Sequence, residues 1–337
     1  MNAPERQPEP HEHYNSEFYD RTVDHERWFV NGMTADEVYE AESAFALRAA
    51  GVQFEDGEGI LDLACGSGRH ALCMEKMLGE KVLILGVDKA DKLIKTANQR
   101  IDREKTEVRD RVRFCVADIR ELPVPERLPE KPFKPKLVTI LGSSFGYLHK
   151  PDERKTALRN FRARLAAGGK LVIQFRETDP KLSPQQREYT ERMKARKEFK
   201  SMRWEDELKH GKICTVIHDD AAGDASYFYE VDCPVPDPEH SEWYSPKARD
   251  PKKPDEPLRF VDPDGIEYSS FSRVYIDNAE QEHDLNPTIV DSFMTVGSFE
   301  KAKGILEEAG FTDVQLHINE QRMGKKMNCA IVATNPA

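Results

Sequence analysis

"ILDLACGSGRHAL", residues 60–72, joins a short apolar run to two closely spaced glycines. The run 60–63 has the character of a buried strand, and the residues after Gly68 can begin a helix. Gly66, Gly68 and Ala71 form the pattern G-x-G-x-x-A, which lets the backbone of a strand-to-helix turn approach a ligand closely. Exposed amides at such a helix start favour polar or anionic groups. The stretch therefore predicts a ligand-binding turn in an α/β fold.

Strands and helices alternate on both sides of this turn. Further strands are predicted at 81–88, 111–118, 134–145, 170–175, 312–318 and 328–335, and helices at 69–78, 89–104, 153–169 and 298–311. This alternation requires crossover connections between parallel strands. The predicted fold class is α/β, with a doubly wound, Rossmann-like sheet of seven mostly parallel strands.

The alternation is interrupted after the fifth strand, which divides the chain into four parts. Residues 1–13 are rich in Pro, Glu and His and are predicted to be a disordered tail. Residues 14–56 are predicted to be a helical segment that covers the ligand, and 57–176 with 287–337 to be the core. Residues 177–286 contain alternating runs such as 212–220 and 225–233, so they predict an antiparallel insertion on the substrate side.

The amino-acid composition argues against several kinds of binding partner. The 337 residues include 61 acidic and 50 basic ones, for a net charge of -11, which argues against a nucleic-acid partner. Six cysteines without a C-x-x-C pair indicate reduced thiols and no zinc site. No stretch approaches the roughly 20 apolar residues of a membrane span. We expect a cytoplasmic protein with a small-molecule partner and no membrane partner; the sequence leaves a homo-oligomer open.

Three aspartates narrow the identity of the ligand. Asp88 ends the second strand, where a carboxylate can accept hydrogen bonds from both hydroxyls of a ribose. Asp118 ends the third strand, where it can contact an adenine amino group while Ile119 packs against the ring. Asp62, just before the glycines, suits a cationic group and would repel a pyrophosphate. The pattern therefore favours S-adenosylmethionine, with its positive sulfonium, over a dinucleotide.

The motifs "ILDLACGSG", "GVD", "VADI" and "RLAAGGKLVI" resemble, in order and spacing, those of class I S-adenosylmethionine-dependent methyltransferases. Within this class the chain is most similar to the glycine/sarcosine N-methyltransferase family, over about residues 19–337. "ILDLACGSG" is similar to that family's "VLDVACGTG", and "TILGSSFGYL" to its "LIGNSFAHL". The resemblance implies the strand order 3-2-1-4-5-7-6 with an antiparallel seventh strand. It also implies that the insertion lies over the acceptor pocket.

The resemblance extends the predicted cofactor site beyond the glycine turn. It implies that Tyr19 and Trp28 belong to a segment that covers the cofactor. The family's arginine for the cofactor carboxylate has an acidic counterpart here, near Glu37, so Arg69, Arg21 and Arg27 remain alternatives for that role. The predicted cofactor-binding set is Tyr19, Trp28, Asp62, Ala64, Gly66, Gly68, Asp88, Lys89, Asp118, Ile119 and Leu141, and no metal is expected.

The predicted acceptor site follows the fourth and fifth strands. By the resemblance, Arg176 stands where an arginine clamps an amino-acid carboxylate; the alternative is a surface arginine paired with an acidic neighbour. Ser143 and Ser144 replace the family's Asn-Ser, which removes an amide and puts glycine itself in doubt as the acceptor. Tyr147 stands in place of a histidine. Methyl transfer depends mainly on alignment, so no catalytic residue is assigned; Tyr147 and Ser143 are the candidates.

The leading hypothesis is an N-methyltransferase of an amino acid or a related small amine. A small-metabolite O-methyltransferase is the alternative within the same class. An NAD(P)-dependent oxidoreductase and a non-catalytic cofactor-binding protein are the more distant alternatives, because the glycine pattern is shared among all of them.

Overall fold

The structure is a computed structural model of the chain. It describes residues 35–122, 127–128, 131–133, 135–148, 151–178, 212–218, 226–232, 245–246, 260–278, 288–294, 296–323 and 326–336. The predicted tail 1–13 lies outside these residues. No helix in this described part is long and apolar enough to span a membrane.

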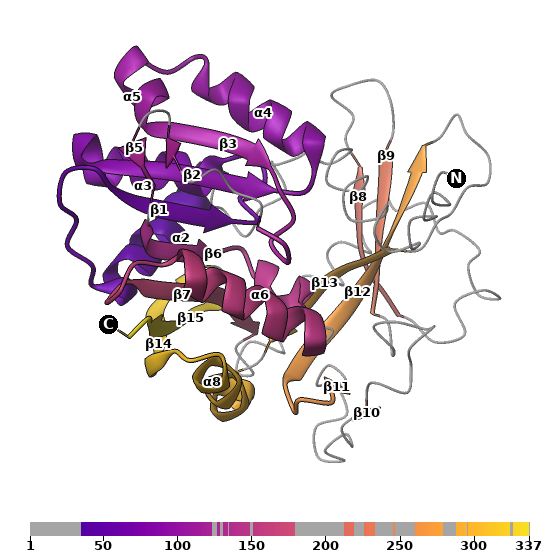
Figure 1. The fold of residues 1–337 in the computed structure, drawn as a ribbon. Helices are drawn as coiled ribbons and strands as arrows, with labels where there is room; N and C mark the ends of the chain where they lie inside the picture. Colours follow the sequence, from indigo (N-terminus) through magenta and orange to yellow (C-terminus); the bar gives the residue numbers. More distant parts are fainter. Residues whose placement is uncertain are drawn as a thin grey trace, which may run out of the picture.

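A seven-stranded sheet forms the core (Figure 1). Its strands are β1 (Glu58–Leu63), β2 (Val82–Asp88), β3 (Val112–Val116), β6 (Pro135–Ile140), β7 (Lys170–Thr178), β14 (Thr312–Met323) and β15 (Lys326–Thr334). The order across the sheet is β14-β15-β7-β6-β1-β2-β3. Within this sheet β1, β2, β3, β6 and β7 are parallel, whereas β15 pairs antiparallel with both β7 and β14. The predicted fold class and the order 3-2-1-4-5-7-6 are confirmed.

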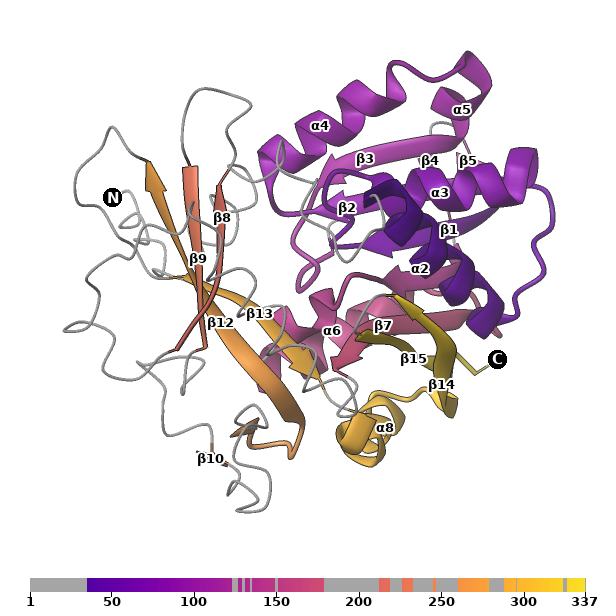
Figure 2. The same cartoon turned by 180° about the vertical axis from the view of Figure 1, so that it is seen from behind.

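Alternating residues of each strand pack into two hydrophobic cores, one on each face of this sheet. Leu61 and Leu63 point to one face and Ile60 to the other, as the two-residue period of a strand requires. On the Ile60 side lie α2 (Ala35–Ala50), α3 (Arg69–Leu78) and α4 (Asp91–Ile101); on the other side lie α6 (Pro151–Arg164) and α8 (Phe299–Glu308). Figure 1 faces α6, and Figure 2 faces α2 and α3.

Smaller elements connect these layers. The short helix α5 (Thr106–Arg111) precedes β3, and β4 (Arg127–Leu128) pairs with β5 (Lys131–Pro132). Three single 3-10 turns are η2 (Gly79–Lys81), η3 (Ser144–Tyr147) and η6 (Val296–Ser298). Of these, η3 matters for the site because it follows directly after β6.

A second, antiparallel sheet follows the fifth core strand and lies beside the first (Figure 2). Its strands are β8 (Lys212–His218), β9 (Ser226–Asp232), β10 (Ser245–Pro246), β11 (Phe260–Val261), β12 (Glu267–Asn278) and β13 (Thr288–Met294). The antiparallel insertion of the predicted fold class is therefore present. Because β13 pairs with β12, this sheet extends past the predicted boundary at residue 286. β13 also lies against η3 and β7, at the carboxyl edge of the core sheet.

A buried arginine joins the two sheets. The Arg154 side chain on α6 is fully buried, and its Nη2 lies 2.5 Å from Oδ2 of Asp262, which is also fully buried. Its Nη1 lies 3.1 Å from Oδ2 of Asp264, and its Nε donates a hydrogen bond of 2.8 Å to the carbonyl of Leu148. The turn between β11 and β12 is thereby fixed to α6 and to the residue that follows η3.

Replacing Arg154 with Met should lower the free energy of unfolding by about 3–5 kcal/mol, because Asp262 would be left as a buried charge without its partner. Urea unfolding followed by circular dichroism measures this loss. Lys155→Met is the matched control, since that exposed lysine lies 3.8 Å from Asp264 and such surface pairs contribute about 0–1 kcal/mol. Equal losses in the two variants would contradict a structural role for the buried pair.

Candidate functional site

The glycine turn lies between the carboxyl end of β1 and the start of α3. Its backbone is left-handed at Ala64 (φ 52°), Gly66 (φ 55°) and Gly68 (φ 79°). A Cβ on Gly68 would lie 2.5 Å from Cζ of Phe114, whereas a Cβ on Gly66 would meet no protein atom within 4 Å. The two glycines therefore serve different purposes. Gly68 lets the turn pack on Phe114, and Gly66 leaves space on the open side of the turn, as close approach of a ligand requires.

Asp88 holds this turn in place from the end of β2. Its Oδ2 accepts a hydrogen bond of 2.9 Å from the amide of Gly66, and its Oδ1 accepts one of 2.9 Å from the amide of Ala90. Burial raises the pKa of Asp88, and these two amides oppose that rise. Each carboxylate oxygen has a second lone pair, so the side chain retains capacity for ribose hydroxyls. The predicted ribose contact is thus compatible with the geometry and stays a prediction.

Asp62 is buried at the end of β1 and is only half satisfied. Its Oδ1 accepts a hydrogen bond of 2.8 Å from the Thr139 hydroxyl, while its Oδ2 has no hydrogen-bond partner in the described part of the chain. Burial raises the pKa of Asp62 to about 6, against the opposing effects of His70 and Thr139. An unpaired buried carboxylate oxygen is costly, and a cationic or hydrogen-bond-donating ligand would satisfy it.

Asp118 is engaged by a neighbour that the sequence did not predict. Arg120 donates from Nε to its Oδ1 at 3.0 Å and from Nη2 to its Oδ2 at 2.6 Å. Burial alone would raise the pKa of Asp118, but these bonds and the charge of Arg120 lower it overall. The predicted contact of Asp118 with an adenine amino group therefore has to use lone pairs that Arg120 leaves free. Ile119 is half-buried and packs against the core on the α6 side.

Arg100 is a second residue that sequence reasoning missed. From α4, its Nη1 donates to the Ser67 carbonyl at 3.0 Å and to the Ser67 hydroxyl at 2.7 Å, which braces the glycine turn from outside. One signal was available. Arg100 follows the buried Ala97 by three positions, so it lies on the face of α4 that packs against the protein.

A buried polar network fixes the chain where β6 ends. Gln174 on β7 accepts a hydrogen bond of 2.5 Å from the amide of Gly142 and donates from Nε2 to Oε1 of Glu42 (3.1 Å) and to Oδ1 of Asn328 (2.6 Å). Glu42 also lies 3.0 Å from Nε2 of His70, so α2 and α3 take part. The Gln174 side chain uses both of its N–H donors and one of its two acceptor lone pairs. These bonds define the orientation of its amide group.

The predicted acceptor residues lie directly after this network. Ser143 is buried and left-handed (φ 66°), a strained backbone for a residue with a side chain, and Ser144 begins η3. Leu141, a predicted cofactor contact, is buried beside them, and Lys89 is exposed after β2. The backbone of Arg176 pairs with Asn328, so β7 continues past the end of β6.

Some predicted residues lie outside what the structure describes. Tyr19, Trp28, Arg21 and Arg27 precede the described residues, and the side chains of Tyr147 and Arg176 are likewise not described. Of the three alternatives for the cofactor carboxylate, only Arg69 can be placed. Its Nη1 lies 2.5 Å from Asp36, and its guanidinium lies 5.5 Å from the ring centroid of Tyr39. Arg69 therefore has its own partners on α2.

The site as a whole gathers at the carboxyl ends of β1, β2 and β6. Asp62, Gly66, Asp88 and Ser143 all belong to this edge, which is where open α/β sheets bind ligands. In the described residues no group of three or more His, Cys, Asp or Glu side chains could hold a metal ion. The arrangement can thus bind and orient small molecules through carboxylates and backbone amides.

The part of the chain that carries this site is similar to known methyltransferases. Residues 60–169, about a third of the chain, match the family model described as a methyltransferase domain. A 27-O-demethylrifamycin SV methyltransferase of Amycolatopsis mediterranei is 28% identical over 158 residues, which are 47% of this chain and 52% of that protein. A dTDP-4-amino-2,3,4,6-tetradeoxy-D-glucose N,N-dimethyltransferase of Saccharopolyspora spinosa is 25% identical over 134 residues, 40% and 47% of the two chains.

The matched part has clear limits. The chain spans about half the length of the curated relatives it matches. Among solved structures, the CcbJ methyltransferase from Streptomyces caelestis superposes with a TM-score of 0.54 at 13% identity, covering 96% of this chain and all of that one, which shows a shared fold. Residues 60–169 are therefore similar to a methyltransferase domain, and the chain as a whole has the fold of the CcbJ methyltransferase.

Proposed function

We propose that the protein methylates the nitrogen of a small-molecule amine, with S-adenosylmethionine as the donor. One observation carries the proposal: a turn that leaves open space at Gly66 is held by Asp88 and lies at the same sheet edge as the unpaired, buried oxygen of Asp62. An unpaired carboxylate oxygen favours a cationic, donor-bearing ligand, and S-adenosylmethionine carries both a sulfonium and an ammonium group.

The residues present fit this cofactor. Asp88 retains lone pairs for ribose hydroxyls, and the open side of Gly66 admits the ligand close to the backbone. Asp62 supplies negative charge in a buried place, where electrostatic attraction is stronger than in water. When bound, S-adenosylmethionine supplies an electrophilic methyl group attached to a positively charged sulfur.

The protein's part in such a transfer is alignment and exclusion of water. An amine can accept a methyl group only with its lone pair free, so the site must bind the neutral amine or let its proton leave. The left-handed Gly142 and Ser143, fixed through Gln174, form a defined wall where β6 ends. β13 of the second sheet lies against η3, on the same side as this wall.

Two classes of small molecule carry an amine that could accept the methyl group. The first is an amino acid of the glycine or sarcosine type, whose carboxylate Arg176 would bind. The second is an amino sugar, supported by the relative from Saccharopolyspora spinosa, whose name describes methylation of the amine of a nucleotide-linked sugar. An O-methyltransferase remains the alternative, because the relative from Amycolatopsis mediterranei is named for methylation at an oxygen.

Methyl transfer from isotopically labelled S-adenosylmethionine tests the proposal. The acceptor panel contains glycine, sarcosine, dimethylglycine, other amino acids, amino sugars, and hydroxylated acids without an amine, with products identified by mass. Label on nitrogen is the expected result. Label found only on oxygen would replace the proposal with its alternative, and the absence of both transfer and cofactor binding would overturn it.

Arg176→Ala separates the two amine classes. Loss of transfer to amino acids with unchanged binding of S-adenosylmethionine is the result expected of a carboxylate clamp. Arg103→Ala, at an exposed arginine after α4, is the matched control for removing one positive charge. Full activity of Arg176→Ala on an amino acid would contradict the clamp and leave amino sugars as the preferred class.

The two glycines of the turn should respond differently to Ala. Gly66→Ala should lose about 1–2 kcal/mol of stability, from the left-handed backbone alone, yet bind S-adenosylmethionine much more weakly. Gly68→Ala should lose about 1–3 kcal/mol more, because its Cβ would clash with Phe114. Thermal unfolding and calorimetric titration measure both effects. Gly51→Ala is the control, because Gly51 also has a left-handed backbone (φ 60°) and open space at its Cβ position but lies at the end of α2, away from the turn. If Gly66→Ala bound the cofactor as tightly as Gly51→Ala does, the turn would not be the cofactor site.

Asp62 should make the cofactor-free protein less stable as the pH rises. A carboxyl group with a pKa of about 6 when folded and 3.8 when unfolded keeps its proton longer in the folded state, so stability is lost between about pH 4 and pH 6. At about 1.4 kcal/mol per pH unit, the cost at neutral pH is about 3 kcal/mol. Asp62→Asn should remove this loss while weakening cofactor binding.

Thermal unfolding of wild type and Asp62→Asn across this pH range isolates the effect of Asp62 and of the groups coupled to it, because groups that do not interact with Asp62 titrate equally in both. Asp110→Asn, at an exposed aspartate of α5, is the control for removing one negative charge. A difference between wild type and Asp62→Asn that does not change with pH would show that Asp62 is not the titrating group.

A further inference from the structure

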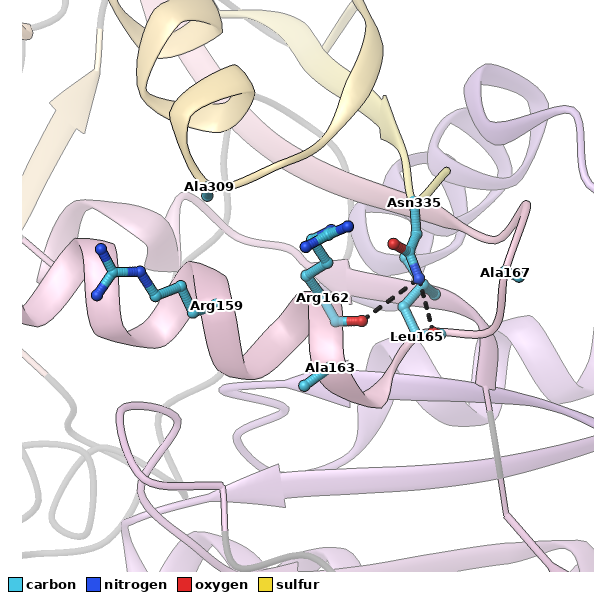
Figure 3. A pocket seen from close by; sticks show the side chains of 7 residues that line it. All are labelled: Arg159, Arg162, Ala163, Leu165, Ala167, Ala309 and Asn335. Carbon is cyan, nitrogen blue, oxygen red and sulfur yellow. Dashed lines mark hydrogen bonds between the residues drawn. The ribbon is translucent and has the colours of Figure 1, made fainter. Parts of the chain in front are cut away.

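An open surface cavity of about 290 Å³ lies at the opposite ends of the core strands from the glycine turn (Figure 3). It is bounded by the last turns of α6, the end of α8 and the end of β15. The residues lining it are Arg159, Arg162, Ala163, Leu165, Ala167, Ala309 and Asn335. Thr334, next to Asn335, pairs with Lys170, the first residue of β7, which places the cavity at the amino edge of the parallel strands. A ligand here would not occupy the cofactor site.

Two arginines give the cavity an uncompensated positive charge. Arg159 and Arg162 lie three positions apart on α6, and neither takes part in an ion pair with another described residue. The Nε of Arg162 is buried and has no hydrogen-bond partner in that part of the chain. Neighbouring like charges destabilise a helix, and an unpaired buried donor costs free energy. The chain has 61 acidic residues and a net charge of -11, so two neighbouring arginines without an acidic partner in the described part of the chain are unexpected.

The groups that would repel an anion are already satisfied. The Nδ2 of Asn335 donates to the carbonyl oxygens of Leu165 at 2.8 Å and of Ala166 at 3.1 Å, and it lies 3.4 Å from that of Arg162 (Figure 3). These carbonyls end α6 and carry the negative end of its dipole. Asn335 is itself buried, so this cap is a fixed part of the wall.

The position of the Arg162 guanidinium is defined by the chain at the end of α8. A Cβ on Gly310 would lie 2.8 Å from its Cζ and Nη1, so the guanidinium packs directly against this glycine, whose φ of 90° also favours glycine. Figure 3 shows Arg162 extended from α6 toward Ala309, whereas the guanidinium of Arg159 points along the helix. Because Arg159 is exposed, it can turn into the cavity by a change of side-chain rotamer.

We propose that this cavity binds a small oxyanion, a phosphate or a carboxylate, through the guanidinium of Arg162 with Arg159 as the second cation. A guanidinium presents paired N–H groups that match two oxygens of such an anion. The volume exceeds that of inorganic phosphate, and Ala163, Leu165, Ala167 and Ala309 leave an apolar wall for an organic part of the ligand. A purely structural role, in which Arg162 neutralises the ends of α6 and α8, is the rival explanation.

Thermal unfolding of the full chain titrated with sodium phosphate, at an ionic strength held constant with sodium chloride, tests the proposal. Wild type should show a saturable rise in Tm. Arg162→Gln should weaken the apparent affinity about tenfold or more, as loss of a charge-assisted contact predicts, and Arg159→Gln should weaken it less. Arg103→Gln, at an exposed arginine after α4, should respond as wild type does. Acetate in place of phosphate distinguishes a carboxylate from a phosphate ligand.

Three results would overturn the proposal. Equal phosphate responses in Arg162→Gln and Arg103→Gln would show a general ionic effect. A lower Tm of Arg162→Gln in chloride alone, with the phosphate response intact, would show the structural role. Competition of phosphate with S-adenosylmethionine in a calorimetric titration would place the anion at the glycine turn. None of these readouts uses methyl transfer, so the test stands or fails independently of the proposed activity.

Discussion

The carboxylate of Asp88 is the constraint on which the site depends. It accepts the amides of Gly66 and Ala90, and so it fixes the glycine turn of β1 to the end of the neighbouring strand β2. A left-handed turn with open space on one side has little to hold it by packing, since the Cβ position of Gly66 meets no protein atom. Hydrogen bonds therefore have to define its shape before a ligand arrives, and Arg100 adds a further brace through Ser67.

The interior beneath this turn is more polar than a fold of this kind requires. Asp62, Glu42, His70, Gln174 and Asn328 are all buried, and most of their polar atoms pair with one another. Oδ2 of Asp62 and Nδ2 of Asn328 have no hydrogen-bond partner among the residues that the structure describes. Buried polar groups destabilise a fold when they lack partners, and proteins tolerate such groups chiefly where they serve function. The unpaired oxygen of Asp62 is thus a stability cost that a cationic cofactor would offset.

The second sheet contacts the core close to η3, where the proposed acceptor site lies. Arg154 links the turn between β11 and β12 to α6 and, through its bond to the Leu148 carbonyl, to the chain just after η3. β13 lies against η3 itself. The wall that follows β6 and the sheet that covers it are therefore held by the same buried charge. The glycine turn is anchored separately by Asp88, so variation in the second sheet can change the surroundings of η3 without disturbing that turn.

Local sequence was sufficient for the order of the core elements and for the position of the glycine turn. Strand and helix periods are properties of neighbouring residues, and the position of Asp88 at the end of a strand follows from them. Resemblance to known motifs then supplied the strand order and the antiparallel last strand. The contacts of Asp118 with Arg120, of Arg100 with Ser67 and of Arg154 with Asp262 were not predicted. Arg154 and Asp262 are 108 positions apart, and no period or spacing relates them.

The sequence by itself determined the alternation of strands and helices and the glycine turn with its carboxylates, because short-range patterns encode both. Only the tertiary structure decided which of those carboxylates keeps an oxygen without a partner among the described residues, which arginines are already engaged there, and where two arginines form no ion pair with any described residue. These properties depend on which side chains from distant segments meet in a buried space, and burial is what makes each such pairing, or its absence, energetically decisive.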